Sequence, residues 1–202
     1  MSIQVILFDI GGVFFKWKDR WLFNNIADRF GLSEIDLTRE CKKEMPRLRL
    51  GKISEQQMWQ RIGRQVNSKE LSNVKDSLIH DFFKSKINLD DSVFTVIKQL
   101  QKKNVTMGIL SNTALPMHCA VEELIDMSYF DFLFLSYEIG MEKPGNEIFE
   151  HVTENMPYSK KEILFVDDRP SNVDAAKDFG IKAIHFTDTF HLVADLSDLE
   201  IL

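Results

Sequence analysis

The sequence has little cysteine, no long apolar run and no excess of basic residues. Its two cysteines, Cys41 and Cys119, are far apart and fit no metal-binding spacing, so we expect reduced structural thiols. The 25 basic residues are outnumbered by 31 acidic ones, which argues against general nucleic-acid binding, because that needs a net basic face. No apolar stretch approaches the roughly 18 residues of a membrane span, and the first apolar run is too short, and lacks a preceding basic region, for a signal peptide. These absences favour a soluble, cytoplasmic protein that binds neither membranes nor nucleic acids.

Five short apolar runs stand out in a composition of 202 residues that is 44% apolar, which is ordinary for a globular chain. Their continuous apolar character is typical of strands covered on both faces, as in a parallel sheet. The last four runs alternate with segments of helical periodicity at residues 90–104, 144–156 and 171–180. This alternation predicts an α/β fold, a doubly wound (Rossmann-like) parallel sheet of about five strands. The runs are residues 3–10, 105–111, 130–136, 162–168 and 182–187.

Residues 16–87 break this rhythm, because they contain several helical stretches and no convincing strand. One stretch ends in Phe30-Gly31, which is typical of a helix stop, and another begins with Ser54, which makes a capping box with Gln57. We therefore expect residues 1–15 and 88–202 to form the α/β core, and residues 16–87 to form a helical insert. The expected helical stretches of the insert are residues 19–32, 33–45, 54–63 and 69–83.

Polar side chains follow the predicted strands at the ends where open α/β sheets bind their ligands. Because the carboxyl ends of parallel strands meet at one edge, we expect these side chains to lie close together, although they come from distant parts of the chain. Taken singly, each has a plainer interpretation as a turn former, a helix cap or a solvated loop lysine. In chain order they are Asp9, Ser111, Asn112, Lys143, Asp167, Asp168 and Asn172.

This ordered set suits phosphoryl transfer. Ser111 and Lys143 supply a hydrogen bond and a positive charge for the equatorial oxygens of a phosphate. Mg²⁺ is usually held by about two carboxylates, together with water and carbonyl oxygens, and Asp9 and Asp168 are the candidates. The metal would let the anionic Asp9 attack an anionic phosphate against Coulomb repulsion. The product of that attack is an aspartyl phosphate.

The same set resembles the haloacid dehalogenase superfamily of phosphatases over essentially the whole chain. FDIGGV is similar to the first family motif, ILSN to the second, IGMEKPGNEIF to the third and ILFVDDRPSNVDAA to the fourth. The resemblance is greatest to the subgroup of the bacterial α-glucose-1-phosphate phosphatases and the N-terminal phosphatase domain of soluble epoxide hydrolases. The insert lies where this family has its helical C1 cap. The resemblance implies a Mg²⁺-dependent phosphatase that acts on a small phosphorylated metabolite, with a sugar phosphate as one candidate.

The resemblance also implies roles for single residues. Asp9 matches the nucleophile, and Lys143 matches the lysine that steadies the nucleophile and the phosphate. Ser111 matches the phosphate-binding hydroxyl, and Asn112 matches a position beside the phosphate that contacts substrate. These four residues are therefore expected to form the catalytic and substrate-binding part of the site.

Asp9 and Asp168 match the metal-binding carboxylates of the family, and the backbone carbonyl of Gly11 matches a third metal ligand. Asp167 matches a position next to the metal ligands that does not bind the metal directly, and Asn172 matches a position that supports the metal-bound waters. Gly11 departs from the family pattern, because relatives carry at this position the Asp that serves as general acid and base. A positioned acid or base is worth roughly 10²–10⁴-fold. We therefore expect aryl or anomeric sugar phosphates, which have stable leaving groups, to be favoured over alkyl phosphates.

Three other functions fit parts of the pattern. A 2-haloacid dehalogenase of the same superfamily does not protonate its leaving halide, but Asp168 and the metal-ligand pattern favour phosphate chemistry. A catalytically weak regulatory or binding protein is supported only by Gly11. A response-regulator receiver also uses Asp, Ser and Lys, but it usually places an acidic pair at its first strand and lacks a helical insert.

Residues of the insert are candidates for substrate recognition. One group follows the first strand, where the chain crosses the mouth of the expected cavity: Lys16, Trp17, Lys18 and Arg20. A solvated basic hairpin is an equal alternative for this segment. Arg47 and Arg49 precede the turn at Gly51 and are further candidates. The five histidines share no ligand spacing and are interpreted as structural, and residues 188–202 as a peripheral closing segment.

Overall fold

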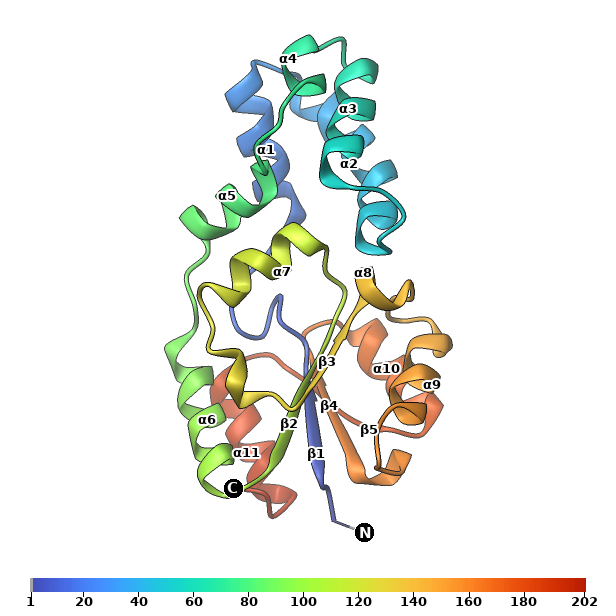
Figure 1. Cartoon of the computed structure of the whole chain (residues 1–202). Coiled ribbons are helices and arrows are strands. Elements are labelled where there is room, and N and C mark those ends of the chain that lie inside the picture. Colours follow the sequence, from blue (N-terminus) through green and yellow to red (C-terminus); the bar gives the residue numbers. More distant parts are fainter. Residues whose placement is uncertain (1) are drawn as a thin grey trace.

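The computed structural model describes residues 2–202, and within that range one sheet of five parallel strands forms the centre of the protein (Figure 1). The strand order is β3-β2-β1-β4-β5, so β1 lies between β2 and β4. Each strand coincides with one of the apolar runs, which confirms the predicted doubly wound α/β fold. The strands are β1 (Val5–Phe8), β2 (Thr106–Ser111), β3 (Phe132–Leu135), β4 (Ile163–Asp167) and β5 (Lys182–His185).

Helices cover both faces of the sheet, as a doubly wound topology requires. Alternate side chains of β1 point to opposite faces: Ile6 and Phe8 belong to one apolar cluster, with α6 and α11, and Val5 and Leu7 to another, with α9 and α10. Because both faces are buried, the strands have no polar side, which explains their continuous apolar character. The covering helices are α6 (Asp91–Lys102), α9 (Asn146–Glu154), α10 (Pro170–Phe179) and α11 (Thr189–Asp198).

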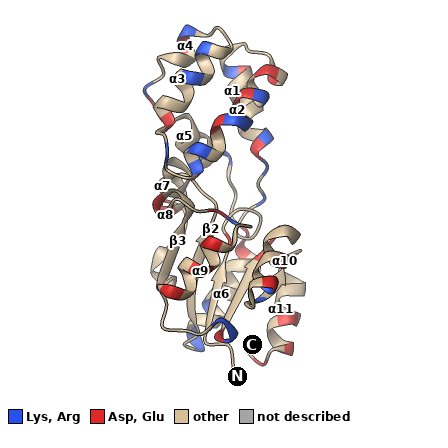
Figure 2. Cartoon of the chain, turned by 90° about the vertical axis from the view of Figure 1, so that its right-hand side faces the viewer, with Lys and Arg blue, Asp and Glu red and all other residues tan. Residues whose placement is uncertain are grey.

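A second group of helices lies beyond the carboxyl edge of the sheet (Figure 1). Acidic and basic residues are interspersed along these helices (Figure 2), as a solvated surface requires. The division of the chain into a core and an inserted cap of residues 16–87 stays a prediction. The helices are α1 (Asp19–Phe30), α2 (Glu34–Arg49), α3 (Glu55–Gln65), α4 (Lys69–Ser72) and α5 (Leu78–Lys86).

Local signals in the sequence set several helix ends. Gly31 follows α1 with a φ of 62°, a left-handed conformation that glycine adopts without a steric cost. The backbone N–H of Gln57 donates to Ser54 Oγ at 3.2 Å, and the backbone N–H of Ser54 donates to Gln57 Oε1 at 2.9 Å. This is the capping box predicted at the start of α3.

The single helix predicted for residues 69–83 is wrong, because the structure has two helices, α4 and α5, with a break between them. The side chain of Asn73 donates to the carbonyl of Lys69 at 2.7 Å and ends α4, while Ser77 accepts from the backbone N–H of His80 and begins α5. Side-chain bonds to the backbone compete here with a continuous helix. The structure also extends α2 beyond residue 45 to Arg49, through Pro46.

Several short elements complete the fold. Helix α11 lies within residues 188–202, and it packs Leu192 and Leu196 into the core. Cys41 and Cys119 are free thiols, as predicted. Over residues 2–202, no helix has the length and apolar character to cross a bilayer. The remaining elements are α7 (Leu115–Glu122), α8 (Ser136–Ile139) and the 3₁₀ turns η1 (Met127–Tyr129) and η2 (Lys160–Glu162).

Candidate active site

The carboxyl ends of the central strands bring the predicted residues together. Asp9 directly follows β1, and its backbone N–H donates to the carbonyl of Val166 in β4 at 2.9 Å. Ser111 is the last residue of β2 on the other side of β1, and Asp167 is the last residue of β4. The side chains of Asp9, Ser111 and Asp167 are all buried. The parallel pairing of the strands therefore places groups from distant parts of the chain at one edge, as expected from the sequence.

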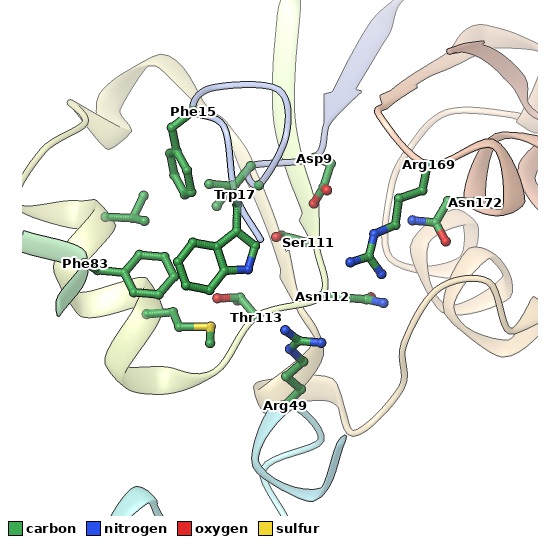
Figure 3. A pocket seen from close by; sticks show the side chains of 14 residues that line it. Asp9, Phe15, Trp17, Arg49, Phe83, Ser111, Asn112, Thr113, Arg169 and Asn172 are labelled. Carbon is green, nitrogen blue, oxygen red and sulfur yellow. The ribbon is translucent and has the colours of Figure 1, made fainter. Parts of the chain in front are cut away.

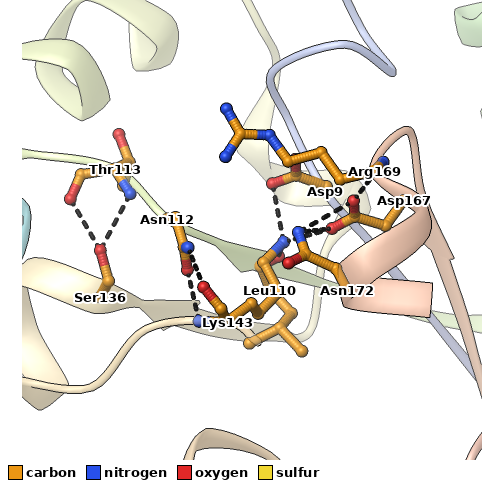
Figure 4. A network of polar contacts seen from close by, with 9 residues as sticks. All are labelled: Asp9, Leu110, Asn112, Thr113, Ser136, Lys143, Asp167, Arg169 and Asn172. Carbon is orange, nitrogen blue, oxygen red and sulfur yellow. Dashed lines mark hydrogen bonds and ion pairs between the residues drawn. The ribbon is translucent and has the colours of Figure 1, made fainter. Parts of the chain in front are cut away.

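Lys143 is the centre of the polar network at this edge (Figure 4). Its Nζ lies 3.0 Å from Oδ1 of Asp9 and 2.7 Å from Oδ2 of Asp167, and it donates to the carbonyl of Leu110 at 2.6 Å. An ammonium group has three donors, and these contacts use all of them. The side chain of Lys143 is fully buried, so its charge is fixed in place beside Asp9.

Asn112 holds the segment that carries Lys143. Its side-chain amide donates to the backbone carbonyl of Lys143 at 2.7 Å, and its Oδ1 accepts from the backbone N–H of Lys143 at 2.9 Å. Asn112 also lines the cavity described below. The amide thus positions Lys143, a contact that the sequence did not predict.

Asp167 is saturated by contacts within the protein. Besides the ion pair with Lys143, its Oδ1 accepts from the backbone N–H of Arg169 at 2.8 Å, and the amide of Asn172 lies 3.0 Å from each of its oxygens. The residue is fully buried. Because these donors occupy its lone pairs, Asp167 is suited to orient Lys143 and Asn172 rather than to bind a ligand directly.

Asp168 differs from its neighbour, because its Oδ1 is buried and has no hydrogen-bond partner within residues 2–202. The backbone beside it leaves no room for a side chain: a Cβ at Gly12 would lie 2.2 Å from Oδ2 of Asp168, and Gly12 has a φ of +90°. Gly12 therefore lets the carboxylate approach the backbone after β1. The adjacent glycines that follow Asp9 were the signal for this close approach.

Asp9, Asp167 and Asp168 form a compact acidic group, with one carboxylate oxygen of each lying within 4.8 Å of the others. Among the described residues 2–202, Lys143 is the one buried cation in contact with Asp9 and Asp167, so three ionised carboxylates leave an excess of two negative charges. Buried charge of one sign is costly unless it is compensated. The excess charge and the unpaired oxygen of Asp168 fit a divalent cation with oxygen ligands, such as Mg²⁺.

The pKa values of two carboxyls in this acidic group are raised. Burial raises the pKa of Asp9, and the charge of Asp167 adds to this effect while Lys143 opposes it. Burial, followed by the charges of Asp9 and Asp167, raises the pKa of Asp168 to about 6. Both shifts reflect the cost of concentrating negative charge away from water, which a bound cation would remove.

A small cavity opens in front of Asp9 and Ser111, with room of about 50 Å³ for the centres of water-sized molecules (Figure 3). One part of its wall is polar and lies at the sheet edge, and the other part is largely apolar. The polar wall consists of Asp9, Ser111, Asn112, Thr113, Arg169 and Asn172, and the remaining wall of Ile10, Gly11, Phe15, Trp17, Arg49, Phe83, Met117 and Val121.

The candidates from the insert divide into two groups. Trp17 and Arg49 line the cavity, whereas Lys16, Lys18, Arg20 and Arg47 are not among the described residues that do so. Arg169 also lines the cavity and was not predicted, although its position directly after Asp167-Asp168 was a signal. The sequence carried no signal for Phe83, Met117 or Val121, because these residues reach the cavity only through the packing of α5 and α7 over the sheet edge.

Comparison with known proteins shows similarity to haloacid dehalogenase-like hydrolases in both sequence and structure. The family model for haloacid dehalogenase-like hydrolases matches residues 6–186. The sesquiterpene phosphatase astK of Aspergillus oryzae is 27% identical over 98% of this chain and 97% of its own length. The D-ribitol-5-phosphate phosphatase of Bacteroides thetaiotaomicron is 28% identical over 89% of this chain and 90% of its own length. A crystal structure of a haloacid dehalogenase family enzyme of the same bacterium, in complex with magnesium and inorganic phosphate, is 25% identical, with a TM-score of 0.80 over 95% of this chain and 99% of that one.

Proposed function

The chain belongs to the haloacid dehalogenase-like hydrolases, and from this premise we propose that it is a Mg²⁺-dependent phosphatase that hydrolyses a small phosphorylated metabolite through an aspartyl phosphate on Asp9. The observation that carries the proposal is the contact between Asp9 and Lys143 at the floor of a cavity that also exposes Ser111. The phosphatases of Aspergillus oryzae and Bacteroides thetaiotaomicron, which match this chain over 97% and 90% of their own length, support phosphate as the group transferred.

Asp9 is the nucleophile in this proposal. One of its carboxylate oxygens forms a bond to phosphorus, and the bond between phosphorus and the leaving oxygen breaks. Lys143, fixed 3.0 Å from Asp9, orients the carboxylate and offsets negative charge, while Ser111 donates to an equatorial phosphoryl oxygen. Water then hydrolyses the aspartyl phosphate and releases inorganic phosphate.

Asp9, Asp168 and the backbone carbonyl of Gly11 would hold Mg²⁺. When bound, the cation neutralises phosphoryl charge and so allows one anion to attack another. The unpaired, buried Oδ1 of Asp168 supports this assignment, as does the saturation of Asp167, which leaves that residue and Asn172 to support the site from behind. Magnesium in the related crystal structure supports the choice of metal.

Gly11 brings no acid to the cavity, so the proposed enzyme favours substrates whose leaving group is stable as an anion. Aryl phosphates and anomeric sugar phosphates are of this kind, whereas simple alkyl phosphates are not. The apolar wall at Trp17 and Phe83 supports an apolar or ring-containing leaving group.

The test is a phosphate-release screen over sugar phosphates, nucleotides, and aryl and alkyl phosphates, in Mg²⁺ and in EDTA, with Asp9→Asn as the blank. We expect Mg²⁺-dependent release that is fastest with aryl or anomeric phosphates and absent from the blank. Release from no phosphate at all, with Mg²⁺ still bound, would favour a regulatory or binding role. Turnover of 2-chloropropionate in EDTA would favour a dehalogenase.

A further inference from the structure

Arg49 is anchored to the sheet side of the molecule through its backbone. Its carbonyl accepts a hydrogen bond from Ser136 Oγ at 2.7 Å, and Ser136 begins α8 directly after β3. Two residues on, a Cβ at Gly51 would lie 2.2 Å from the carbonyl oxygen of Tyr137, so the turn after α2 packs tightly on α8. The end of α2 is therefore docked at a fixed place beside the cavity.

The side chain of Arg49 is anchored as well, by Asp19 at the start of α1. Nη2 of Arg49 lies 2.5 Å from Oδ1 of Asp19, and the same oxygen accepts from Nε1 of Trp17 at 2.9 Å. One carboxylate oxygen thus holds both the guanidinium and the indole in the cavity wall. Of the Arg49 side chain, only 15% is exposed.

Within residues 2–202, the ion pair with Asp19 is the one hydrogen bond of this guanidinium, so most of its five N–H donors have no acceptor. Nε of Arg49 is buried and makes no hydrogen bond to any residue in the range 2–202. Nε itself is closed to solvent, but Arg49 lines the cavity, so the remaining free donors of its guanidinium are satisfied when a ligand brings an oxygen. Arg49 is therefore poised to receive an anionic or polar ligand atom.

The direction of attack determines which ligand atom that is. In phosphoryl transfer the attacking and leaving oxygens lie roughly in line, on opposite sides of phosphorus. Asp9 attacks from the sheet edge, so the leaving oxygen points away from the sheet, toward the side from which α2 brings Arg49 (Figures 1 and 3). Asp9 lines the cavity at the sheet edge and Arg49 lines it at the end of α2, so the leaving oxygen is the phosphoryl oxygen that points toward Arg49.

The cavity offers no proton for that oxygen. Apart from Asp9, the described residues that line it include no carboxylic acid, imidazole, thiol or phenol. Gly11, where a relative would place an acid, has no side chain. A leaving group that cannot be protonated must depart as an anion, and a fixed positive donor stabilises it.

We propose that Arg49 is a further catalytic residue, which stabilises the leaving oxygen as an anion in place of a general acid. This inference rests on the proposed phosphatase function. As the Asp9 oxygen bonds to phosphorus, the electron pair of the breaking P–O bond passes to the leaving oxygen, which Arg49 binds as a hydrogen-bond donor. The guanidinium keeps its proton, and the released anion takes a proton from water.

The test measures kcat/KM for a series of aryl phosphates whose phenols increase in pKa, with the wild-type enzyme, Arg49→Gln and Arg47→Gln. Arg47 is a matched control, because it lies one half-turn away on the same helix with its side chain 48% exposed. We expect Arg49→Gln to lose about 10²–10³-fold with the poorest leaving group and little with the best, so that kcat/KM depends more steeply on leaving-group pKa. Arg47→Gln should follow the wild type.

An equal loss across the whole series would overturn the proposal, because it would show that Arg49 only binds substrate. If Arg49→Gln does not fold, Arg49→Met decides, since it keeps an unbranched stem but removes the charge and the donors: a steeper dependence supports the proposal and an unchanged slope overturns it. Failure of the phosphatase function itself looks different, since the wild-type enzyme would then hydrolyse none of the series or Asp9→Asn would retain activity.

Discussion

The ammonium nitrogen of Lys143 lies 3.0 Å from Oδ1 of Asp9, in an ion pair whose lysine side is completely buried. The other donors of this ammonium are occupied by Asp167 and by the carbonyl of Leu110, so it cannot turn away from Asp9. The pair gives the proposed nucleophile a fixed orientation and a compensating charge.

Lys143→Met leaves the buried carboxylates of Asp9 and Asp167 without their cation. We expect a loss of about 3–5 kcal/mol in the free energy of unfolding, measured by urea denaturation in EDTA, together with loss of phosphatase activity. Lys84→Met is the control, because Lys84 pairs with Glu123 at an exposed position, where an ion pair contributes about 0–1 kcal/mol. Equal stabilities of the two variants would show that the buried pair has no special role.

Gly12→Ala should weaken Mg²⁺ binding, because its Cβ would lie 2.2 Å from the carboxylate of Asp168 and must displace it. Misplacing a group that supports a metal typically costs about 10–100-fold in affinity, which isothermal titration calorimetry would resolve. Gly11→Ala is the matched control, since its Cβ would have its nearest neighbours in Trp17 at 3.9 Å and the backbone carbonyl is kept. Identical affinities for the two variants would argue against Asp168 as a metal ligand.

The metal-free protein should lose stability as the pH rises from 3.8 to about 6, the ordinary and the raised pKa of Asp168. An acid whose pKa is higher in the folded state binds its proton more tightly there, so its contribution is fully present below the lower value and is lost through the higher one. Thermal unfolding in EDTA should show a smaller decline for Asp168→Asn than for the wild type. A decline of the same size in both would contradict the shift.

Gly11→Asp should improve turnover of alkyl phosphates. The variant restores an acid next to the leaving oxygen, and the cavity near Gly11 has space for it. We expect the ratio of kcat/KM for an alkyl phosphate to that for p-nitrophenyl phosphate to rise about 10²-fold, the lower end for a positioned acid. An unchanged ratio would mean that the missing acid does not limit this enzyme.

The sheet and its polar edge were predictable from the sequence for a physical reason. Strands that are buried on both faces read as continuous apolar runs, and parallel strands bring their carboxyl ends together whatever the length of chain between them. Asp9, Ser111 and Asp168 therefore meet as expected. The different surroundings of Asp167 and Asp168 could not be predicted, because two adjacent carboxylates in a sequence do not reveal which one Lys143 contacts.

The wall of the cavity that faces the sheet was largely unpredictable. Arg49 reaches it only because Ser136 and Gly51 dock the end of α2 on α8, and Phe83 only because α5 begins after a break that Asn73 and Ser77 create. Such contacts depend on how helices pack across the sheet edge. Neither hydrophobic periodicity nor capping patterns contain that information.

The role of Asp9 as the nucleophile is tested most directly by the rate of phosphate release from p-nitrophenyl phosphate by Asp9→Asn in saturating Mg²⁺, relative to the wild type. Asparagine has nearly the same shape as aspartate but cannot form an acyl phosphate. We expect release indistinguishable from the uncatalysed rate, in a protein whose circular dichroism is unchanged. Release by Asp9→Asn at the wild-type rate would contradict this role.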